Sequence, residues 1–409
     1  MVASDSELRS RRDATALPPV WTSDDPESFA HDVIHVRHPR LIEQVRAAHP
    51  FAPEQDSGLA RLAAEMAGPV QPPDPSTVEA PAWHRWSRHY LGKRWDQLPF
   101  LWAESYFYRR LLETCGHFTP GPWFWLDPFA HLKTAELADA ALADELAGLD
   151  RLTQLDPEAR GDALLLAALW GNRADLGFAA HAAQPDLPVH EHLVVDDSPA
   201  LWDILRTGHT GRDGRAGVCV VADNAGRELL SDLLLIDHIL ETDAADQVLL
   251  HVKPTPYYVS DATAADVAAC LRRLAAADGY AATVAGRLHE AFRTGRVRLR
   301  THWFYAAPFG FDAMPDDLAE EFAASTVTIV KGDLNYRRLV GDLHWPATID
   351  SRQAIGYFPG PVAAVRTLKS EVVVGLSEST LAELNSRQPG WRTAGTHGLV
   401  QVTRRGLVA

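Results

Sequence analysis

The stretch Val218-Cys-Val-Val-Ala-Asp-Asn-Ala-Gly226 joins a buried strand to the beginning of a helix, and it decides the fold class. Its first five residues form an unbroken apolar run, and a helical pattern follows over Gly226–Leu240. The same order recurs downstream, with a strand pattern at Gln247–Val252 and a helical pattern at Ala264–Ala277. Continuous apolar strands that alternate with helices are typical of a mostly parallel sheet covered on both faces. The sequence therefore predicts a three-layer α/β/α domain.

Further strand candidates extend this pattern toward the C-terminus. They are Val297–Tyr305, Thr326–Val330, Val362–Leu368 and Val372–Leu376. Before about residue 177 the periodicity is helical instead, as in the spacing of Leu41 and Val45. We therefore expect a disordered or loosely packed N-terminus at 1–30, an all-helical domain at 31–187 and an α/β/α catalytic domain at 188–409.

Composition narrows the class of protein. The chain has 409 residues, 46% of them hydrophobic and 23% charged, which is typical of a globular protein with a large core. Its formal net charge of −15 argues against nonspecific binding to nucleic acid or to anionic membranes. We expect neither a membrane span nor a signal peptide, because the apolar runs are too short. Widely spaced cysteines without a CxxC pair favour a reducing compartment, so we expect a cytoplasmic protein whose oligomeric state stays open.

The segments just beyond the predicted strands carry most of the chemistry. In open parallel sheets, ligands bind next to the carboxyl ends of the strands. These segments are Asp223-Asn-Ala-Gly226, Lys253 to Asp261, Lys331-Gly-Asp-Leu-Asn-Tyr-Arg337 and Arg366-Thr-Leu-Lys369. The whole chain contains only five lysines, and three of them lie in these segments. We therefore expect the segments to meet at one edge of the sheet.

Asp223, Asn224 and Asp261 form the best candidate set for a divalent metal. Carboxylate and amide oxygens are the ligands that Mg²⁺ and Mn²⁺ prefer. Taken alone, however, the Asp-Asn-Ala-Gly stretch is also typical of a turn that caps a helix. The metal interpretation depends on convergence of the strand ends at one place.

Lys331, Arg366 and Lys369 suit a phosphate group, because lysine supplies a point charge and arginine a two-pronged donor. The predicted helix starts near Gly226 and Asn335 would add backbone N–H groups. A metal beside such a cationic cradle favours phosphoryl chemistry. The alternative is that these basic residues form an exposed turn and a solvated strand edge.

Motifs in both halves of the chain occur in a specific order. They are Trp102-Ala-Glu-Ser-Tyr-Phe-Tyr-Arg-Arg110, Leu169-Trp-Gly-Asn-Arg-Ala-Asp-Leu176, Asp223-Asn-Ala-Gly-Arg-Glu-Leu-Leu-Ser-Asp232, Lys331-Gly-Asp-Leu-Asn-Tyr-Arg337 and Arg366-Thr-Leu-Lys369. From about residue 30 onward the chain resembles the damage-control phosphatase family, long described as a domain of unknown function. Its Arg-Thr-x-Lys motif is similar to that of the sugar-phosphate branch, whose members are also described as acidic-residue methyltransferases.

The resemblance implies a fold and a set of site residues. It implies an α/β/α domain with an N-terminal helical domain, and a divalent metal, often Mn²⁺, Co²⁺, Ni²⁺ or Mg²⁺, at Asp223, Asn224 and Asp261. It also implies substrate contacts along Asp333–Arg337 and at Lys369. Glu104 and Arg109 either close over the substrate from the helical domain or form an ion pair between the domains.

We therefore expect a metal-dependent phosphatase that hydrolyses phosphomonoesters of small metabolites, such as fructose phosphates, in a house-cleaning role. The expected catalytic residues are Asp223, Asn224, Asp261 and Asp333. The expected substrate-binding residues are Glu104, Arg109, Lys331, Asp333, Leu334, Asn335, Tyr336, Arg337, Arg366, Thr367 and Lys369. Water activated beside the metal, or alternatively an aspartate, would attack phosphorus.

Two alternatives come from other functional classes. The first is an S-adenosylmethionine-dependent protein carboxyl methyltransferase, which the resemblance permits. The sequence favours it less, because a glycine-rich loop is missing after an early strand and a methyl donor needs no cluster of Lys and Arg. The second is a noncatalytic sensor of sugar phosphates.

Overall fold

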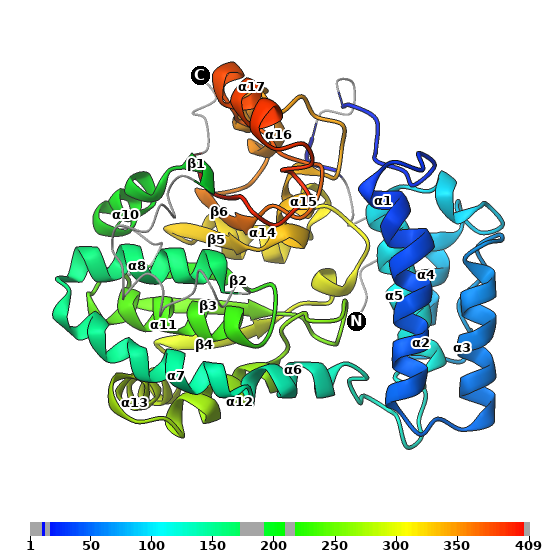
Figure 1. Cartoon of the computed structure of the whole chain (residues 1–409), viewed down its shortest axis with the longest axis horizontal. Coiled ribbons are helices and arrows are strands. Elements are labelled where there is room, and N and C mark those ends of the chain that lie inside the picture. The colour runs from blue at the N-terminus through cyan, green and yellow to red at the C-terminus, as the bar shows by residue number, and fades with distance from the viewer. Residues whose placement is uncertain (1–9, 13–16, 172–191, 209–216, 405–409) are drawn as a thin grey trace.

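A computed structural model describes residues 10–12, 17–171, 192–208 and 217–404 of the chain. Its centre is a seven-stranded sheet in the order β1-β7-β6-β5-β2-β3-β4 (Figure 1). The strands are β1 (Leu193–Asp196), β2 (Gly217–Val221), β3 (Gln247–Val252), β4 (Val297–Thr301), β5 (Val327–Lys331), β6 (Val362–Thr367) and β7 (Gly398–Thr403). All neighbouring pairs are parallel except β6 and β7. The predicted mostly parallel sheet is confirmed.

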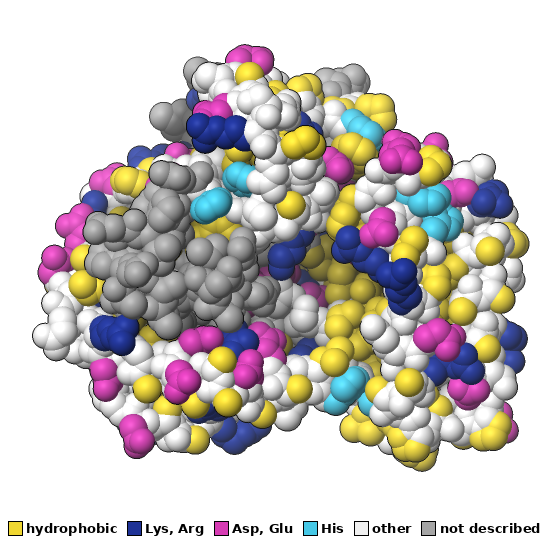
Figure 2. All heavy atoms as spheres, in the orientation of Figure 1, with side chains coloured by type: hydrophobic (Ala, Val, Ile, Leu, Met, Phe, Trp, Pro, Cys, Tyr) yellow, Lys and Arg dark blue, Asp and Glu magenta, His cyan; other side chains and the backbone are white. Residues whose placement is uncertain are grey.

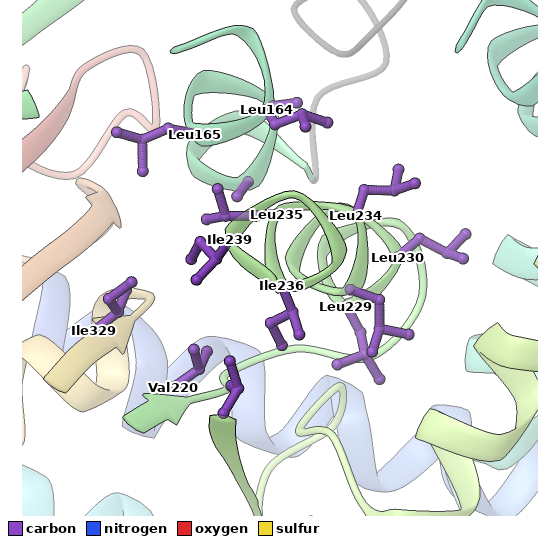
Figure 3. Packing of buried hydrophobic residues seen from close by; sticks show 14 of the residues in the cluster. Leu164, Leu165, Val220, Leu229, Leu230, Leu234, Leu235, Ile236, Ile239 and Ile329 are labelled. Carbon is purple, nitrogen blue, oxygen red and sulfur yellow. The ribbon is translucent and has the colours of Figure 1, made fainter. Parts of the chain in front are cut away.

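Helices cover both faces of the sheet, as a three-layer α/β/α domain requires. One face packs against α8 (Pro157–Trp170), α10 (Ser198–Thr207), α11 (Arg227–Glu241), α12 (Ala264–Ala275) and α13 (Gly279–Thr294). The other face packs against α14 (Asp316–Ala323), α15 (Asp333–Val340), α16 (Ser351–Ile355) and α17 (Glu378–Arg387). Figure 3 shows Ile236 of α11 directed toward the sheet, on the side where Val220 of β2 lies. This dry core fixes α11 above the central strands.

The sheet differs from the prediction at its margins. The segment Val372–Leu376 is buried but is not a strand. Its backbone groups bond outside the sheet instead. Val372 accepts from Arg366 and Val374 donates to Tyr336, whereas Gly375 and Leu376 donate to the carbonyls of Ile349 and Ala347. The strand expected at Val297–Tyr305 ends at Thr301 and gives way to a short 3₁₀ helix. Strands β1 and β7 had not been predicted from the sequence.

The N-terminal helices form a second hydrophobic core beside the sheet, seen on the right in Figure 1. They are α1 (Phe29–Asp32), the π-helical turn η3 (Val33–Arg37), α2 (His38–Ala48), α3 (Pro53–Glu65), α4 (Ala80–Ser87) and α5 (Phe100–Thr114). Next along the chain come α6 (Ala130–Leu137) and α7 (Ala140–Gly148). Buried residues of α7 and α8 belong to the core of the sheet, so that core reaches further toward the N-terminus than the expected division at 187 and 188.

The part of 1–30 that the structure describes beyond residue 16 is packed rather than loose. Val20 forms a β-bridge with Leu343, and the ring of Trp21 stacks on His344 with centroids 3.6 Å apart. These contacts fasten the helical layer to the layer of α14–α16. Among the described residues, no helix has both the length and the apolar character that a membrane span requires.

Candidate active site

A pocket of about 320 Å³ lies between the helical layer and the carboxyl ends of the central strands. Figure 2 shows a hollow between the two halves of the molecule, with basic side chains on both sides of it. From the sheet side it is lined by Leu169, Asp223, Asn224, Glu228, Tyr258, Val259, Ser260, Asp261, Gly332, Asp333, Leu334, Arg337, Val365, Thr367 and Lys369. From the helical side it is lined by Phe29, Arg37, Glu104 and Tyr108. The predicted strand ends therefore do meet at one place.

Backbone pairing brings the three candidate metal ligands together. Asn224 and Asp261 form an antiparallel bridge, although the strands before them are parallel. The carbonyl oxygen of Asp223 accepts a hydrogen bond of 2.8 Å from the amide of Ala262, and Ala225 donates one of 2.7 Å to Ser260. The segments after β2 and β3 thus fold back on each other and hold Asp223 and Asp261 against the same pocket.

The charge balance around Asp223 is unfavourable for a buried carboxylate. Burial, followed by the nearby carboxylates of Glu228 and Asp261, raises the pKa of Asp223 well above its ordinary value. The ammonium group of Lys253 offsets part of this negative charge. Its Nζ donates a hydrogen bond of 3.3 Å to the Oδ1 of Asn335. Burial in turn lowers the pKa of Lys253. A positive ion in the pocket would relieve the repulsion among the carboxylates.

The donor chemistry fits a hard divalent cation. The candidate set comprises two carboxylates, Asp223 and Asp261, and the amide of Asn224. Across the described ranges, no three His, Cys, Asp or Glu side chains gather to hold a metal. Carboxylate and amide oxygens, completed by water, are ligands that such a cation accepts. The Nδ2 of Asn224 lies 3.2 Å from Asp223 and 2.9 Å from Glu228, and Ser260 donates to its Oδ1 at 2.6 Å. A half-turn of this amide would present Oδ1 to an ion beside Asp223.

Gly332 is the residue that lets β5 pass so close to Asp223. Its φ of +80° lies in the left-handed region, which favours glycine. A Cβ at this position would collide with the carboxylate of Asp223. The glycine therefore both ends β5 and leaves the space in which Asp223 faces the pocket.

The expected Asp333–Arg337 segment contributes to the site in two different ways. Asp333, Leu334 and Arg337 line the pocket at the first turn of α15. Asn335 and Tyr336 are buried behind the pocket and do not line it. Their position therefore does not support the direct contact with substrate that was expected of them. Asn335 donates 3.1 Å to the carbonyl of Ala222 and so ties α15 to the end of β2. Tyr336 donates to Gln401 of β7 at 3.1 Å.

Lys369 is the basic residue of the Arg-Thr-x-Lys motif that reaches the pocket. It is exposed, and the structure gives its ammonium group no hydrogen bond or ion pair within the described part of the chain. Its backbone N–H donates to Asp333 at 2.9 Å, which fixes the loop after β6. Thr367 also lines the pocket and donates to the carbonyl of Leu169 at 2.9 Å.

The other basic residues expected to anchor phosphate are engaged by contacts inside the protein. Arg366 is buried, bonds to Ser370, Val372 and Asp333, and lies over the ring of Tyr336. It therefore shapes the loop that carries Lys369 and does not line the pocket.

Lys331 is equally buried and also lies behind the pocket lining. It forms an ion pair of 2.8 Å with Asp232 of α11 and donates to the carbonyl of Ala168. The expected phosphate contact of Lys331 is thus replaced by a link between β5, α8 and α11. The reason is that a buried ammonium group needs a paired carboxylate nearby.

The helical layer supplies one of the two residues expected from it. Glu104 of α5 lines the pocket, accepts from Arg337 at 2.6 Å and from the hydroxyl of Tyr258 at 3.2 Å. It is therefore both a pocket residue and an ion pair between the layers. Arg337 also forms a two-pronged ion pair with Asp342.

Arg109 faces away from the pocket. It donates to Thr77 at 2.8 Å and to the carbonyl of Val78 at 3.0 Å, and pairs with Glu113 at 3.5 Å. It lies five positions after Glu104, and on a helix this spacing puts two side chains on different faces. Its expected role in substrate binding is therefore not supported by its position.

The helix start at Gly226 is also occupied from within the chain. The backbone N–H of Arg227 donates 3.0 Å to the carboxylate of Glu136 in α6, so this helix end is not left for a phosphate. The start of α15, in contrast, lies on the pocket through Gly332, Asp333 and Leu334.

Several pocket residues had not been singled out from the sequence. Glu228 lies on α11 one turn after Asn224, and Tyr258 precedes Asp261 on the same loop. Lys253, which the sequence does place at a strand end, is buried and does not line the pocket. Arg37 and Tyr108 come from the helical layer, which no rule about strand ends covers. Of the motif that begins at Leu169, residues 172–176 lie outside the described residues.

Comparison with known proteins identifies the family of this chain. The family model for the damage-control phosphatase ARMT1-like domain matches residues 33–384. Damage-control phosphatase ARMT1 of Danio rerio is 31% identical over 334 residues, 75% of this chain and 74% of that protein. The protein of the same name from Mus musculus is 28% identical over 432 residues, 94% of this chain and 98% of its own. A solved DUF89 family protein from Pyrococcus horikoshii has a TM-score of 0.49 at 16% identity, covering 92% of this chain and 97% of that one. Because the family model spans most of its length, the chain belongs to the damage-control phosphatase ARMT1-like family.

Proposed function

We propose that this protein is a metal-dependent phosphatase that hydrolyses phosphomonoesters of small metabolites, with sugar phosphates such as fructose phosphates as its substrate class. Membership of a damage-control phosphatase family supports the phosphatase activity. The observation that carries the finer proposal is the meeting of Asp223, Asp261 and Lys369 in one pocket of about 320 Å³. That volume suits a small metabolite rather than a polymer.

The acidic corner would hold the metal. Asp223 and Asp261 would bind it through carboxylate oxygens, with Asn224 as a third ligand after rotation of its amide. When bound, a divalent ion such as Mn²⁺ or Mg²⁺ polarises a phosphoryl oxygen and lowers the pKa of water. The residues behind this corner keep it rigid, since Gly332 leaves the space for Asp223 and Asn335 ties α15 to β2.

Lys369 would bind the phosphate group on the sheet side. Its ammonium group is not committed to a carboxylate among the described residues, so it can offset charge that develops on the phosphoryl oxygens. In the overall reaction the oxygen of water bonds to phosphorus, the ester P–O bond breaks and the leaving oxygen takes up a proton. Asp333 supports this role indirectly, because it anchors the backbone of Lys369.

The helical side of the pocket suits the hydroxyl groups of a sugar. Glu104, Tyr258 and Arg337 form a hydrogen-bonded group there. Such groups both donate and accept hydrogen bonds, as recognition of a polyol requires. This polar side favours a phosphosugar over an apolar phosphate ester.

A substrate panel with metal-free enzyme tests the proposal. The chain is treated with a chelator, and phosphate release from fructose 1-phosphate, fructose 6-phosphate, glycerol phosphate and a phosphopeptide is measured with and without Mn²⁺. We expect release only with the metal, and faster release from the fructose phosphates than from the phosphopeptide. Equal rates with and without metal would contradict metal dependence, and tight binding of phosphosugars without any turnover would favour a sensor instead.

A further inference from the structure

The pocket contains more acidic than basic side chains. An anionic ligand therefore depends on the few cationic side chains that line it. The acidic residues are Glu104, Asp223, Glu228, Asp261 and Asp333, and the basic residues are Arg37, Arg337 and Lys369. Arg337 is buried and committed to Glu104 and Asp342. Lys369 on the sheet side and Arg37 on the helical side therefore remain as the cations with donors to offer to an anionic ligand.

Arg37 is held at the pocket by one exposed ion pair, which engages only its Nε. Its side chain is 58% exposed, and its Nε donates 2.6 Å to Asp32, which is 46% exposed. Its guanidinium carbon lies 4.9 Å from the centre of the Phe29 ring, which lines the same pocket. No contact of its terminal nitrogens is found within the described parts of the chain. An exposed ion pair of this kind is weak, so an incoming dianion can replace it.

The local backbone explains why Arg37 is placed there. Arg37 ends the π-helical turn Val33–Arg37, which interrupts the helix between α1 and α2. On a regular α-helix, side chains three and four residues apart are neighbours, and those five apart are not. A π turn pairs residues five apart, so Asp32 and Arg37 meet on one side. Such turns occur frequently at functional sites, and this one carries a cation into the pocket.

We propose that Arg37 is a substrate-binding residue, whose guanidinium grips the phosphate group of the substrate from the helical layer while Lys369 binds it from the sheet. Asp32 holds Arg37 in place when the pocket is free and releases its Nε on binding. A guanidinium can make two parallel hydrogen bonds to a phosphate, which a lysine cannot. This proposal rests on the proposed function, and it adds that the substrate is bound by both layers at once.

Substitution of Arg37 tests the proposal by kinetics. Arg37→Gln is compared with Arg40→Gln, an exposed arginine three residues further along α2, in Mn²⁺ with fructose 1-phosphate. We expect Arg37→Gln to raise KM by about tenfold or more while kcat changes by less than about threefold, and Arg40→Gln to match the wild type. Arg37→Lys should recover part of the loss, and Asp32→Asn should not raise KM. An unchanged KM in Arg37→Gln overturns the proposal.

A binding measurement keeps the result independent of turnover. Inorganic phosphate is titrated calorimetrically into the Mn²⁺-loaded wild type, Arg37→Gln and Arg40→Gln. Weaker binding in Arg37→Gln alone supports the role of Arg37, and equal binding in all three, or no binding in the wild type, overturns it. A wild type that binds phosphate but releases none from any phosphosugar defeats the proposed function, whereas the phosphate titration still decides on Arg37.

Discussion

Gly332 leaves the space that the carboxylate of Asp223 occupies, although the two residues follow different strands. The φ of +80° at Gly332 and the collision that a Cβ would make are two separate reasons for glycine at this position. The first concerns only the backbone, and the second concerns the pocket that Asp223 lines. A matched pair of variants separates them.

Gly332→Ala should inactivate the enzyme, because Asp223 must move to admit the new methyl group. We expect kcat/KM to fall by about 100-fold or more, and the free energy of unfolding to fall by about 1–3 kcal/mol. Gly92→Ala is the control, since Gly92 has φ +79° but open space around a Cβ. It should lose about 1 kcal/mol of stability and keep full activity. Phosphate release and urea denaturation measure both, and an active Gly332→Ala variant would contradict this view of the site.

Lys331 is a stabilising residue rather than a phosphate ligand. Lys331→Met leaves the carboxylate of Asp232 buried without its cation, so we expect a loss of about 3–5 kcal/mol in the free energy of unfolding. Lys93→Met, on an exposed lysine, should change it by less than about 0.5 kcal/mol. Denaturant titration gives both numbers. A Lys331→Met variant of normal stability but raised KM would restore the phosphate-anchoring role.

Helices α8 and α11 pack together over the sheet, and His238 of α11 lies in their interface, where a Cβ on Gly161 of α8 would meet its ring. Burial, followed by the charge of Arg160, lowers the pKa of His238 from 6.5 to about 4. The folded protein thus keeps this ring neutral in a range where the unfolded chain binds a proton. The interface is therefore sensitive to acid.

The contribution of His238 should be complete above pH 6.5 and decline as the pH falls toward about 4. We expect His238→Gln to lose less stability than the wild type between pH 7.5 and pH 5. Urea denaturation at the two pH values provides the measurement, and His289→Gln, at an exposed position of α13, serves as the control. Equal pH slopes in wild type and His238→Gln would show that the interface does not depend on a neutral ring.

At the scale of elements, the sequence predicts those segments whose own pattern is strong. β2, β3, β5 and β6 are short apolar runs followed by turns, and all were expected within a residue or two. β1 has only four residues and depends on pairing with β7, so its local pattern is weak. The apolar run Val372–Leu376 looks like a strand, but its backbone is taken up by Arg366 and Tyr336. Tertiary contacts decide whether such an apolar run joins the sheet, and these contacts cannot be read from a single sequence.

In the molecule as a whole, the pocket depends on two layers that are far apart in sequence. The rule that ligands bind at strand ends places Asp223, Asp261, Asp333 and Lys369 together from the sequence. The same rule does not tell which side chains at a strand end point back into the core. Lys331 was therefore expected to bind phosphate, whereas it forms an ion pair with Asp232 of α11. The contribution of the helical layer was foreseen only at Glu104. Arg37 and Tyr108 also reach the pocket from this layer. Their positions depend on packing and on a π-helical turn that was not recognised in the sequence.

Binding of Mn²⁺ is the most direct test of the claim that Asp223 and Asp261 form a metal site at the junction of these layers. Calorimetric titration of Mn²⁺ into chelator-treated protein should show one ion bound per chain in the wild type and in Arg40→Gln. Asp223→Asn and Asp261→Asn should each weaken binding by about tenfold or more, since each removes one charged ligand. A wild type that binds no Mn²⁺, or an isotherm that neither substitution changes, would contradict the account.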